Sequence, residues 1–152
     1  MLVIDKFEQT VEKHGDKIAL VDGVRSITFS ELRKEALDLA AVLYETIGAE
    51  SKPILVAVNR RIETVVAYLA VLYSGNFYVP VSDEEAAGRM EQIAEKLEAE
   101  AGIFHEKNCF ESLNLTAISS KAKATGAVDV NRLRDGIIDA DPCYVLFTSG
   151  ST

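Results

Sequence analysis

The sequence predicts an α/β fold with a mostly parallel sheet flanked by helices. Segments typical of strands and helices alternate along most of the chain. The stretch "PILVAV" (53–58) is apolar without alternation, as expected for a strand covered on both faces of a parallel sheet. With 152 residues, of which 48% are hydrophobic, the chain is long enough to bury a core of its own.

The chain opens with features of a helix followed by a β-hairpin. Apolar residues at helical spacing predict a helix over 3–13. Two short β-rich runs follow, "KIALVDG" (17–23) and "RSITF" (25–29), and the Asp22-Gly23 turn signal between them predicts that they pair.

The next helix carries a start signal and a stop signal. Thr28 and Glu31 have the spacing of a capping box, in which each side chain bonds the other residue's backbone N–H. Ile27 and Leu32 stand where a hydrophobic staple would pack, and Gly48 is a natural end. We therefore expect a long helix between Thr28 and Gly48.

Further elements follow in the same alternation. Pro80 cannot donate to a ladder, so its strand is expected to lie at a sheet edge or to end there. Ser82 and Glu85 repeat the capping-box spacing before another helix. The predicted helices are 62–73, one after Ser82 that buries Met90, Ile93 and Leu97, and a short one within 130–142; the predicted strands are 77–81, 101–104, 115–119 and 143–147.

Composition excludes several classes of function. The 24 acidic and 16 basic residues give a net charge of −8, which argues against a general nucleic-acid binder or a binder of anionic membranes. The longest apolar run, 65–73, is far shorter than the roughly 20 residues of a membrane span. The first residues lack a basic start followed by an apolar core, so we expect no targeting segment. We expect a soluble, cytoplasmic protein.

Histidine and cysteine provide no recognisable metal or catalytic pattern. His14 and His105 are isolated from each other, and neither follows a pattern with acids or thiols. Cys109 and Cys143 are too few for a disulfide framework, so both are expected to be reduced thiols. No metal site is predicted.

The last five residues, "TSGST", form the candidate site. Their hydroxyls, and a glycine that lets the backbone turn, suit an anion at the carboxyl end of a parallel strand. The alternatives are a frayed polar terminus or a serine nucleophile; the second is rejected because no G-x-S-x-G elbow surrounds either serine. The predicted phosphate-binding residues are Thr148, Ser149, Gly150, Ser151 and Thr152.

Four motifs in order give the chain a family resemblance. "ITFSEL" (27–32), "YLAVLYSGNFYVPVS" (68–82), "GRMEQIAEKLEAEAGIF" (88–104) and "YVLFTSGST" (144–152) resemble core motifs of the adenylate-forming superfamily. This superfamily includes acyl-CoA synthetases, luciferases, nonribosomal peptide synthetase adenylation domains and D-alanine:carrier-protein ligases. Arg89 stands at the family's usual arginine. The departures are Ser82 for a common aspartate, and Ala86 and Ala87 where a proline is usual.

The resemblance implies an enzyme that uses ATP and Mg²⁺ to activate a carboxylic or amino acid as an acyl-adenylate. The acyl group would then pass to a pantetheine thiol of a carrier protein or of CoA. The residues "FYVPV" (77–81) favour the carrier-protein branch of the family. Residues 1–152 are expected to be the N-terminal subdomain of such an AMP-binding domain, truncated within the phosphate loop and inactive alone. The alternative is a noncatalytic folded fragment or a small nucleotide- or partner-binding module. Exposed apolar sheet edges would favour self-association.

Overall fold

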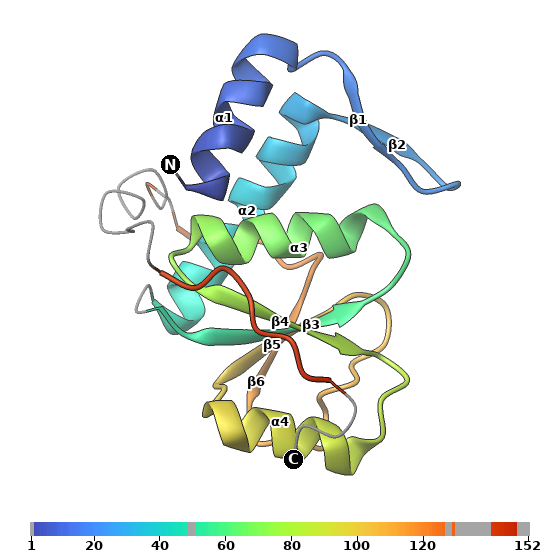
Figure 1. Ribbon diagram of the computed structural model, residues 1–152, viewed down its shortest axis with the longest axis vertical. Coiled ribbons are helices and arrows are strands. Elements are labelled where there is room, and N and C mark those ends of the chain that lie inside the picture. The colour runs from blue at the N-terminus through green and yellow to red at the C-terminus, as the bar shows by residue number, and fades with distance from the viewer. Residues whose placement is uncertain (1, 49–50, 127–128, 130–140, 149–152) are drawn as a thin grey trace.

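The computed structural model (Figure 1) has a four-stranded parallel sheet between helices, which confirms the predicted fold class. It describes residues 2–48, 51–126, 129 and 141–148. The elements are α1 (Val3–His14), β1 (Ile18–Val21), β2 (Ser26–Thr28), α2 (Phe29–Ile47), β3 (Pro53–Val58), α3 (Ile62–Tyr73), β4 (Phe77–Ser82), α4 (Ala87–Leu97), β5 (Ala101–Phe104) and β6 (Thr116–Ser119). The predicted short helix within 130–142 falls almost entirely outside the described residues.

The sheet separates two apolar clusters. Helices α1, α2 and α3 cover one face, and α4 covers the other (Figure 1). Ile54 and Val56 of β3 pack into the first cluster, whereas Leu55 and Ala57 pack into the second. Because side chains of a strand alternate between faces, a strand covered on both must be apolar throughout. This is why "PILVAV" shows no alternation.

The strand order is β4-β3-β5-β6, so the chain changes direction across the sheet. It passes from β3 to β4 on one side, and then returns to place β5 on the other side of β3. The carboxyl ends of β3 and β5 therefore flank the topological switch point of the sheet.

The α2 helix begins and ends as predicted. The Glu31 N–H donates to Thr28 Oγ1 at 3.2 Å, and the Thr28 N–H donates to Glu31 Oε2 at 2.8 Å. Ile27 and Leu32 are both buried in the first cluster, as a staple requires. Gly48 ends the helix with φ of 72°, a backbone conformation that favours glycine.

The second predicted capping box is wrong. Helix α4 begins at Ala87, and its N-cap residue, Ala86, makes no side-chain capping bond. Ser82 is still paired with Val58 in the β3–β4 ladder, so it is the last residue of a strand and not a helix cap. Its hydroxyl accepts from the Glu84 N–H at 3.2 Å, which forms a tight turn before the helix.

The hairpin β1–β2 is antiparallel, as predicted, and stands apart from the main sheet. Arg25, after its turn, forms a two-pronged ion pair with Glu35 of α2, with N···O distances of 2.8 and 3.0 Å. It also reaches Glu63 of α3 at 3.2 Å. These contacts raise the pKa of Arg25, chiefly through the hydrogen bond to Glu35. They fix the hairpin over the start of α3.

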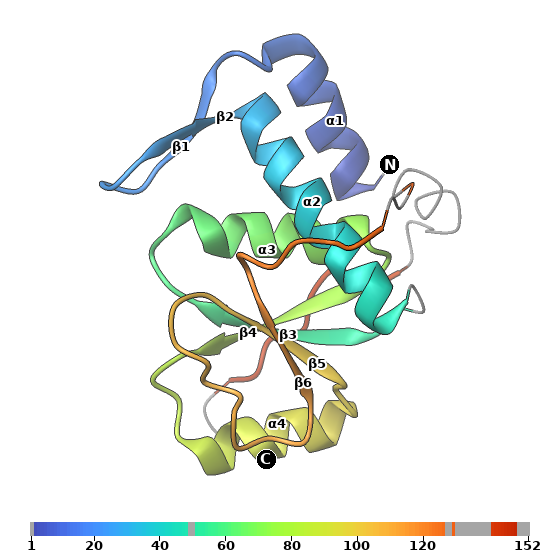
Figure 2. The ribbon, with the colours of Figure 1, turned by 180° about the vertical axis from the view of Figure 1, so that it is seen from behind.

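The chain after β6 crosses the helices on the first face (Figure 2). Ala122 and Ala124 pack against the first apolar cluster. The Glu45 carboxylate accepts the backbone N–H groups of Thr125 and Gly126 at 3.0 and 2.6 Å. These bonds lower the pKa of Glu45 and secure the crossing segment to α2.

None of the helices in the described ranges has the length and apolar character that crossing a membrane would demand.

Candidate phosphate-loop site

Residues 141–148 run parallel to β4 and end at the carboxyl edge of the sheet (Figure 1). The Tyr78 N–H donates to the Cys143 carbonyl at 3.1 Å, and the Val145 N–H donates to the Tyr78 carbonyl at 3.1 Å. This is a single bridge, so the predicted strand 143–147 pairs with β4 as a parallel neighbour without forming a regular ladder.

Pro80 gives a reason why the pairing stops there. In β4 the backbone groups of Tyr78 face the 141–148 segment, and those of residue 80 face the same way because strand directions repeat every two residues. The next ladder bond would need an N–H from residue 80, which proline lacks. The predicted placement of Pro80 at an edge or a strand end is confirmed in this sense.

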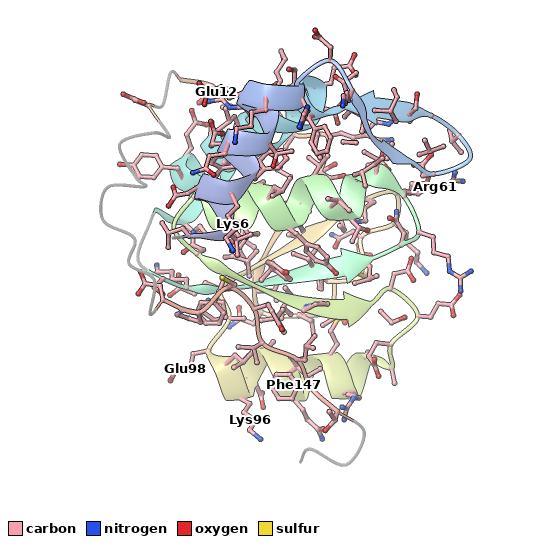
Figure 3. The ribbon with its side chains drawn as sticks, turned by 45° about the horizontal axis from the view of Figure 1, so that its top comes forward. Lys6, Glu12, Arg61, Lys96, Glu98 and Phe147 are labelled. Atoms are coloured by element: carbon pink, nitrogen blue, oxygen red, sulfur yellow. The ribbon has the colours of Figure 1, made fainter. Side chains whose placement is uncertain are left out.

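Side chains of the 141–148 segment alternate between the core and the surface. Val145 and Phe147 pack into the cluster on the α4 face, while Tyr144 and Leu146 are 54% and 62% exposed. Tyr144 stacks on Tyr78, with ring centroids 5.8 Å apart. The Lys96 Nζ lies 5.8 Å from the centroid of Phe147, on the α4 side of the molecule (Figure 3). The segment is thus held by apolar burial on the α4 face and by the Tyr78–Tyr144 stack on the other face.

Arg89 joins helix α4 to the first residue of the candidate loop. Its Nη2 donates to the Thr148 carbonyl at 3.1 Å. Its Nε lies 3.6 Å from Glu85 Oε1, one helical turn earlier. This bond joins the end of the 141–148 segment to the first turn of α4.

An open depression lies beside this contact. It is lined by Pro80 and Ser82 of β4, by Glu85 and Arg89 around the start of α4, and by Phe147. Such a hollow at the carboxyl ends of parallel strands is where open α/β sheets place their ligands. The hollow therefore lies at the sheet edge where the predicted phosphate loop begins.

Of the predicted site residues, only Thr148 lies within the described part of the chain. It is exposed at the end of the segment. Ser149, Gly150, Ser151 and Thr152 lie outside the described residues. The prediction of a phosphate site at 148–152 stays a prediction.

The remaining candidate residues have structural surroundings. His105 is buried, and its ring nitrogens lie 2.7 Å from the Ala57 carbonyl oxygen and 3.1 Å from Ser120 Oγ. Both thiols, Cys109 and Cys143, are free, and burial raises the pKa of Cys109. Within the described ranges, no three His, Cys, Asp or Glu side chains gather closely enough to hold a metal ion.

The sequence did not predict the hydrogen bond between Arg89 and the Thr148 carbonyl. Arg89 was singled out only by its position in a family motif, and its partner Thr148 is 59 residues away. A signal that could have found it is the position of Arg89 on the first turn of α4, directly after the edge strand β4. An arginine at this position can reach the segment that lies beside β4.

Comparison with known proteins places this geometry in a family. Residues 7–152 match the profile of the family described as AMP-binding enzyme. Bacitracin synthase 3 of Bacillus licheniformis is 28% identical over 96% of this chain, which corresponds to 2% of that protein.

Two solved structures from Klebsiella oxytoca share the fold. One is an artificially fused adenylation–PCP di-domain of a nonribosomal peptide synthetase, NpsA-ThdA, with a TM-score of 0.80 and 23% identity; the match covers 97% of this chain and 28% of that one. The other is the NpsA N-terminal subdomain in complex with anthranilyl-AMSN, with a TM-score of 0.78 and 23% identity; the match covers 97% of this chain and 38% of that one. The chain thus spans a small part of each of these proteins, and it belongs to the AMP-binding enzyme family.

Proposed function

We propose that residues 1–152 form the first part of the N-terminal subdomain of an acyl-adenylate-forming ligase. The observation that carries this proposal is the family match over 7–152, which includes the predicted phosphate loop at 148–152. In the intact enzyme, ATP would activate a carboxylic or amino acid as an acyl-adenylate, with release of pyrophosphate. Because the chain covers a small share of its relatives, we propose that it does not perform this reaction alone.

The described residues would contribute by positioning. Arg89 holds the carbonyl of Thr148, the first residue of the predicted loop, beside the start of α4. Hydroxyl and amide donors held in place stabilise phosphate charge without reorganising during the reaction. Mg²⁺ would supply further neutralisation of the ATP phosphates. Glu85 and Ser82 border the hollow, and one carboxylate beside the ATP phosphates is a ligand set that Mg²⁺ accepts, but we derive no step through the ion.

We propose a pantetheine thiol as the acyl acceptor, carried by a carrier protein in preference to CoA. Two observations support this: the relatives include peptide synthetases, and one similar structure is fused to a PCP domain. An amino or hydroxy acid is the substrate class that this branch suggests. The proposed location is the cytoplasm, which supplies ATP and keeps thiols reduced.

The first test is the reading frame that follows Thr152. If it continues, the longer protein and the 152-residue chain are assayed side by side for carboxylate-dependent exchange of pyrophosphate into ATP. We expect exchange with the longer protein and none with the 152-residue chain. The longer protein carrying Arg89→Ala should lose kcat while it stays folded. Lys13→Ala, which removes an exposed cation of α1, should leave kcat unchanged. Exchange by the 152-residue chain above a mock preparation would contradict the proposed division of function.

We also propose that the isolated chain self-associates through the outer face of 141–148. Tyr144 and Leu146 present large apolar side chains to solvent, beside backbone groups that the single bridge leaves free to pair. Sedimentation velocity should show a concentration-dependent dimer that Leu146→Glu abolishes. Val24→Glu, which changes an equally exposed apolar residue in the hairpin, is the matched control. A monomer at every concentration, or equal loss with both variants, would exclude this face.

A further inference from the structure

Three tyrosine rings connect helix α3 with the segment that precedes the predicted phosphate loop. Tyr68 of α3 stacks on Tyr78 of β4, with ring centroids 4.1 Å apart and 16° between the ring planes. Tyr78 also stacks on Tyr144, with centroids 5.8 Å apart and 22° between the planes. Tyr78 and Tyr144 are direct partners in the parallel bridge, so their side chains lie next to each other on one face. We call these three residues the tyrosine stack.

The first two rings of the tyrosine stack are held in the core. Tyr68 and Tyr78 both pack against the apolar cluster on the α1–α3 face. Burial raises the pKa of both hydroxyls, so both rings stay neutral at physiological pH. Because Tyr68 contacts the Tyr78 ring, it restricts the rotamers that Tyr78 can adopt. Tyr78 therefore presents a ring of fixed orientation to Tyr144, which is 54% exposed.

Backbone pairing alone specifies the register of the 141–148 segment weakly. The single bridge supplies two hydrogen bonds, through the N–H groups of Tyr78 and Val145. A slip of one residue would turn Val145 and Phe147 away from the cluster on the α4 face, so burial opposes it. A slip of two residues would leave every side chain on its own face. A further contact is needed to select between registers that differ by two residues.

The tyrosine stack makes this selection. A slip of two residues would place Pro142 or Leu146 opposite Tyr78, where Tyr144 now lies. Neither of these side chains has an aromatic face, so the stacking on Tyr78 would be lost. The slip would also move the first residue of the predicted loop by roughly 7 Å, since a strand rises about 3.3 Å per residue.

We propose that Tyr68 and Tyr78 are positioning residues of the predicted phosphate loop, which act through Tyr144 to set its register at the sheet edge. This role rests on the adenylation function proposed for the longer protein. The bond from Arg89 to Thr148 favours the same register from the α4 side. A loop displaced by roughly 7 Å could not donate to the same phosphate oxygens, because those hydrogen bonds need distances of about 3 Å.

The first test measures amide hydrogen exchange in the 152-residue chain, at a concentration where sedimentation shows a monomer. The readout is the Val145 amide, which donates to the Tyr78 carbonyl. Tyr78→Leu and Tyr68→Leu should each speed exchange at Val145 by about fivefold, relative to amides of β3 and β5 in the same sample. Tyr78→Phe retains the ring and should exchange like the native chain. Unchanged exchange at Val145 in Tyr78→Leu would overturn the proposal.

A swap of two exposed side chains is the matched control. The double variant Tyr144→Leu, Leu146→Tyr keeps the native composition and leaves the core side chains in place. If the ring at position 144 sets the register, protection at Val145 should be lost or should pass to Phe147, because the tyrosine then lies two residues later. Native protection at Val145 in the swap would mean that apolar side chains of any kind hold the segment, and would overturn the role of the stack.

The second test compares kcat and KM for pyrophosphate exchange in the longer protein. Tyr78→Leu should lower kcat by about fivefold and leave KM for the carboxylic acid unchanged, and Tyr78→Phe should retain native kcat. Tyr44→Leu, which removes an exposed ring from α2, should have no effect. Native kcat in Tyr78→Leu, despite faster exchange at Val145, would overturn the positioning role. A longer protein that is inactive without any substitution would contradict the proposed function instead, and the hydrogen exchange would still decide whether the stack sets the register.

Discussion

Asp22, in the hairpin turn, accepts the backbone N–H of Ile62, the first residue of α3, at 2.9 Å. The cap of this helix thus comes from a residue 40 positions earlier in the chain. Arg61, the residue in the local cap position, makes no side-chain capping bond. The hairpin and α3 are therefore coupled, because the same carboxylate also accepts the Val24 and Arg25 N–H groups through its other oxygen.

Asp22→Asn should reduce stability at neutral pH by removing one of these bonds selectively. The asparagine Oδ1 can still serve the hairpin turn, but its NH₂ group would face the Ile62 N–H. In the native chain the hydrogen bonds from Arg25, then Ile62 and Val24, lower the pKa of Asp22 from 3.8 to about 2. Its contribution is thus present above the unfolded pKa of 3.8 and lost as the pH falls through about 2.

Urea unfolding at pH 7 and at pH below the folded pKa checks this expectation. The difference between Asp22→Asn and the native chain should be present at pH 7 and disappear in acid. Asp16→Asn, an exposed aspartate just before the hairpin, is the control for the change in net charge. A difference that stays constant with pH would show that the carboxylate's charge is not the source of the effect.

Thr28→Ala should destabilise the chain by about 0.5 to 2 kcal/mol, because it removes the acceptor for the Glu31 N–H at the start of α2. The side chain of Glu31 would keep its bond to the residue 28 N–H, so the helix should start at the same place. The midpoint of denaturant unfolding should fall with no change in slope. Thr28→Ser retains the hydroxyl and should stay close to the native midpoint; equal losses for both would point to packing of the threonine methyl.

Gly102→Ala should cost about 1 to 3 kcal/mol through overpacking. A Cβ at this position in β5 would lie 2.8 Å from Cε2 and 2.9 Å from Cδ2 of Phe110, whose ring is buried. Gly88→Ala on α4 is the matched control, since nothing lies within 4 Å of its added Cβ. That variant should be neutral or slightly more stable. Adding Phe110→Leu to Gly102→Ala should recover part of the loss; strict additivity would contradict the clash.

Local signals predicted much of the fold. The boundaries of α2 followed from Thr28, Glu31 and Gly48, whose side-chain or backbone properties act within one helical turn. The strand β3 and the helix α3 followed from apolar runs of the right length. These elements depend on neighbours in sequence, so a sequence reading is enough to find them.

Contacts between distant residues limited the rest. The capping-box spacing at Ser82 and Glu85 was present, but pairing of Ser82 with Val58 across the sheet overrode it. In the candidate site, the "TSGST" residues alone predicted that a loop begins at Thr148. They did not predict the contact of Thr148 with Arg89. The exposure of Leu146 was also hidden, because its neighbours are apolar on both sides and show no alternation.

Pro80→Ala should extend the pairing between β4 and the 141–148 segment. The new N–H at residue 80 would face the Val145 carbonyl, and the Phe147 N–H would then reach the carbonyl of residue 80, continuing the register of the Tyr78–Tyr144 bridge. Amide hydrogen exchange at Phe147 should slow relative to the native chain. Overall stability should change little, because a bond worth about 0.5–1.5 kcal/mol is offset by the greater freedom of the unfolded chain, about 0.4–1 kcal/mol.

Pro53→Ala provides the control for that loss of restriction in the unfolded chain. Pro53 is the first residue of β3 and pairs with Phe77, away from the 141–148 segment. It should destabilise the chain without slowing exchange at Phe147. If the Phe147 amide exchanges in Pro80→Ala as fast as in the native chain, the missing donor is not what ends the ladder. Slower exchange at Phe147 in Pro80→Ala alone would show that a single proline keeps the segment before the loop from joining the sheet.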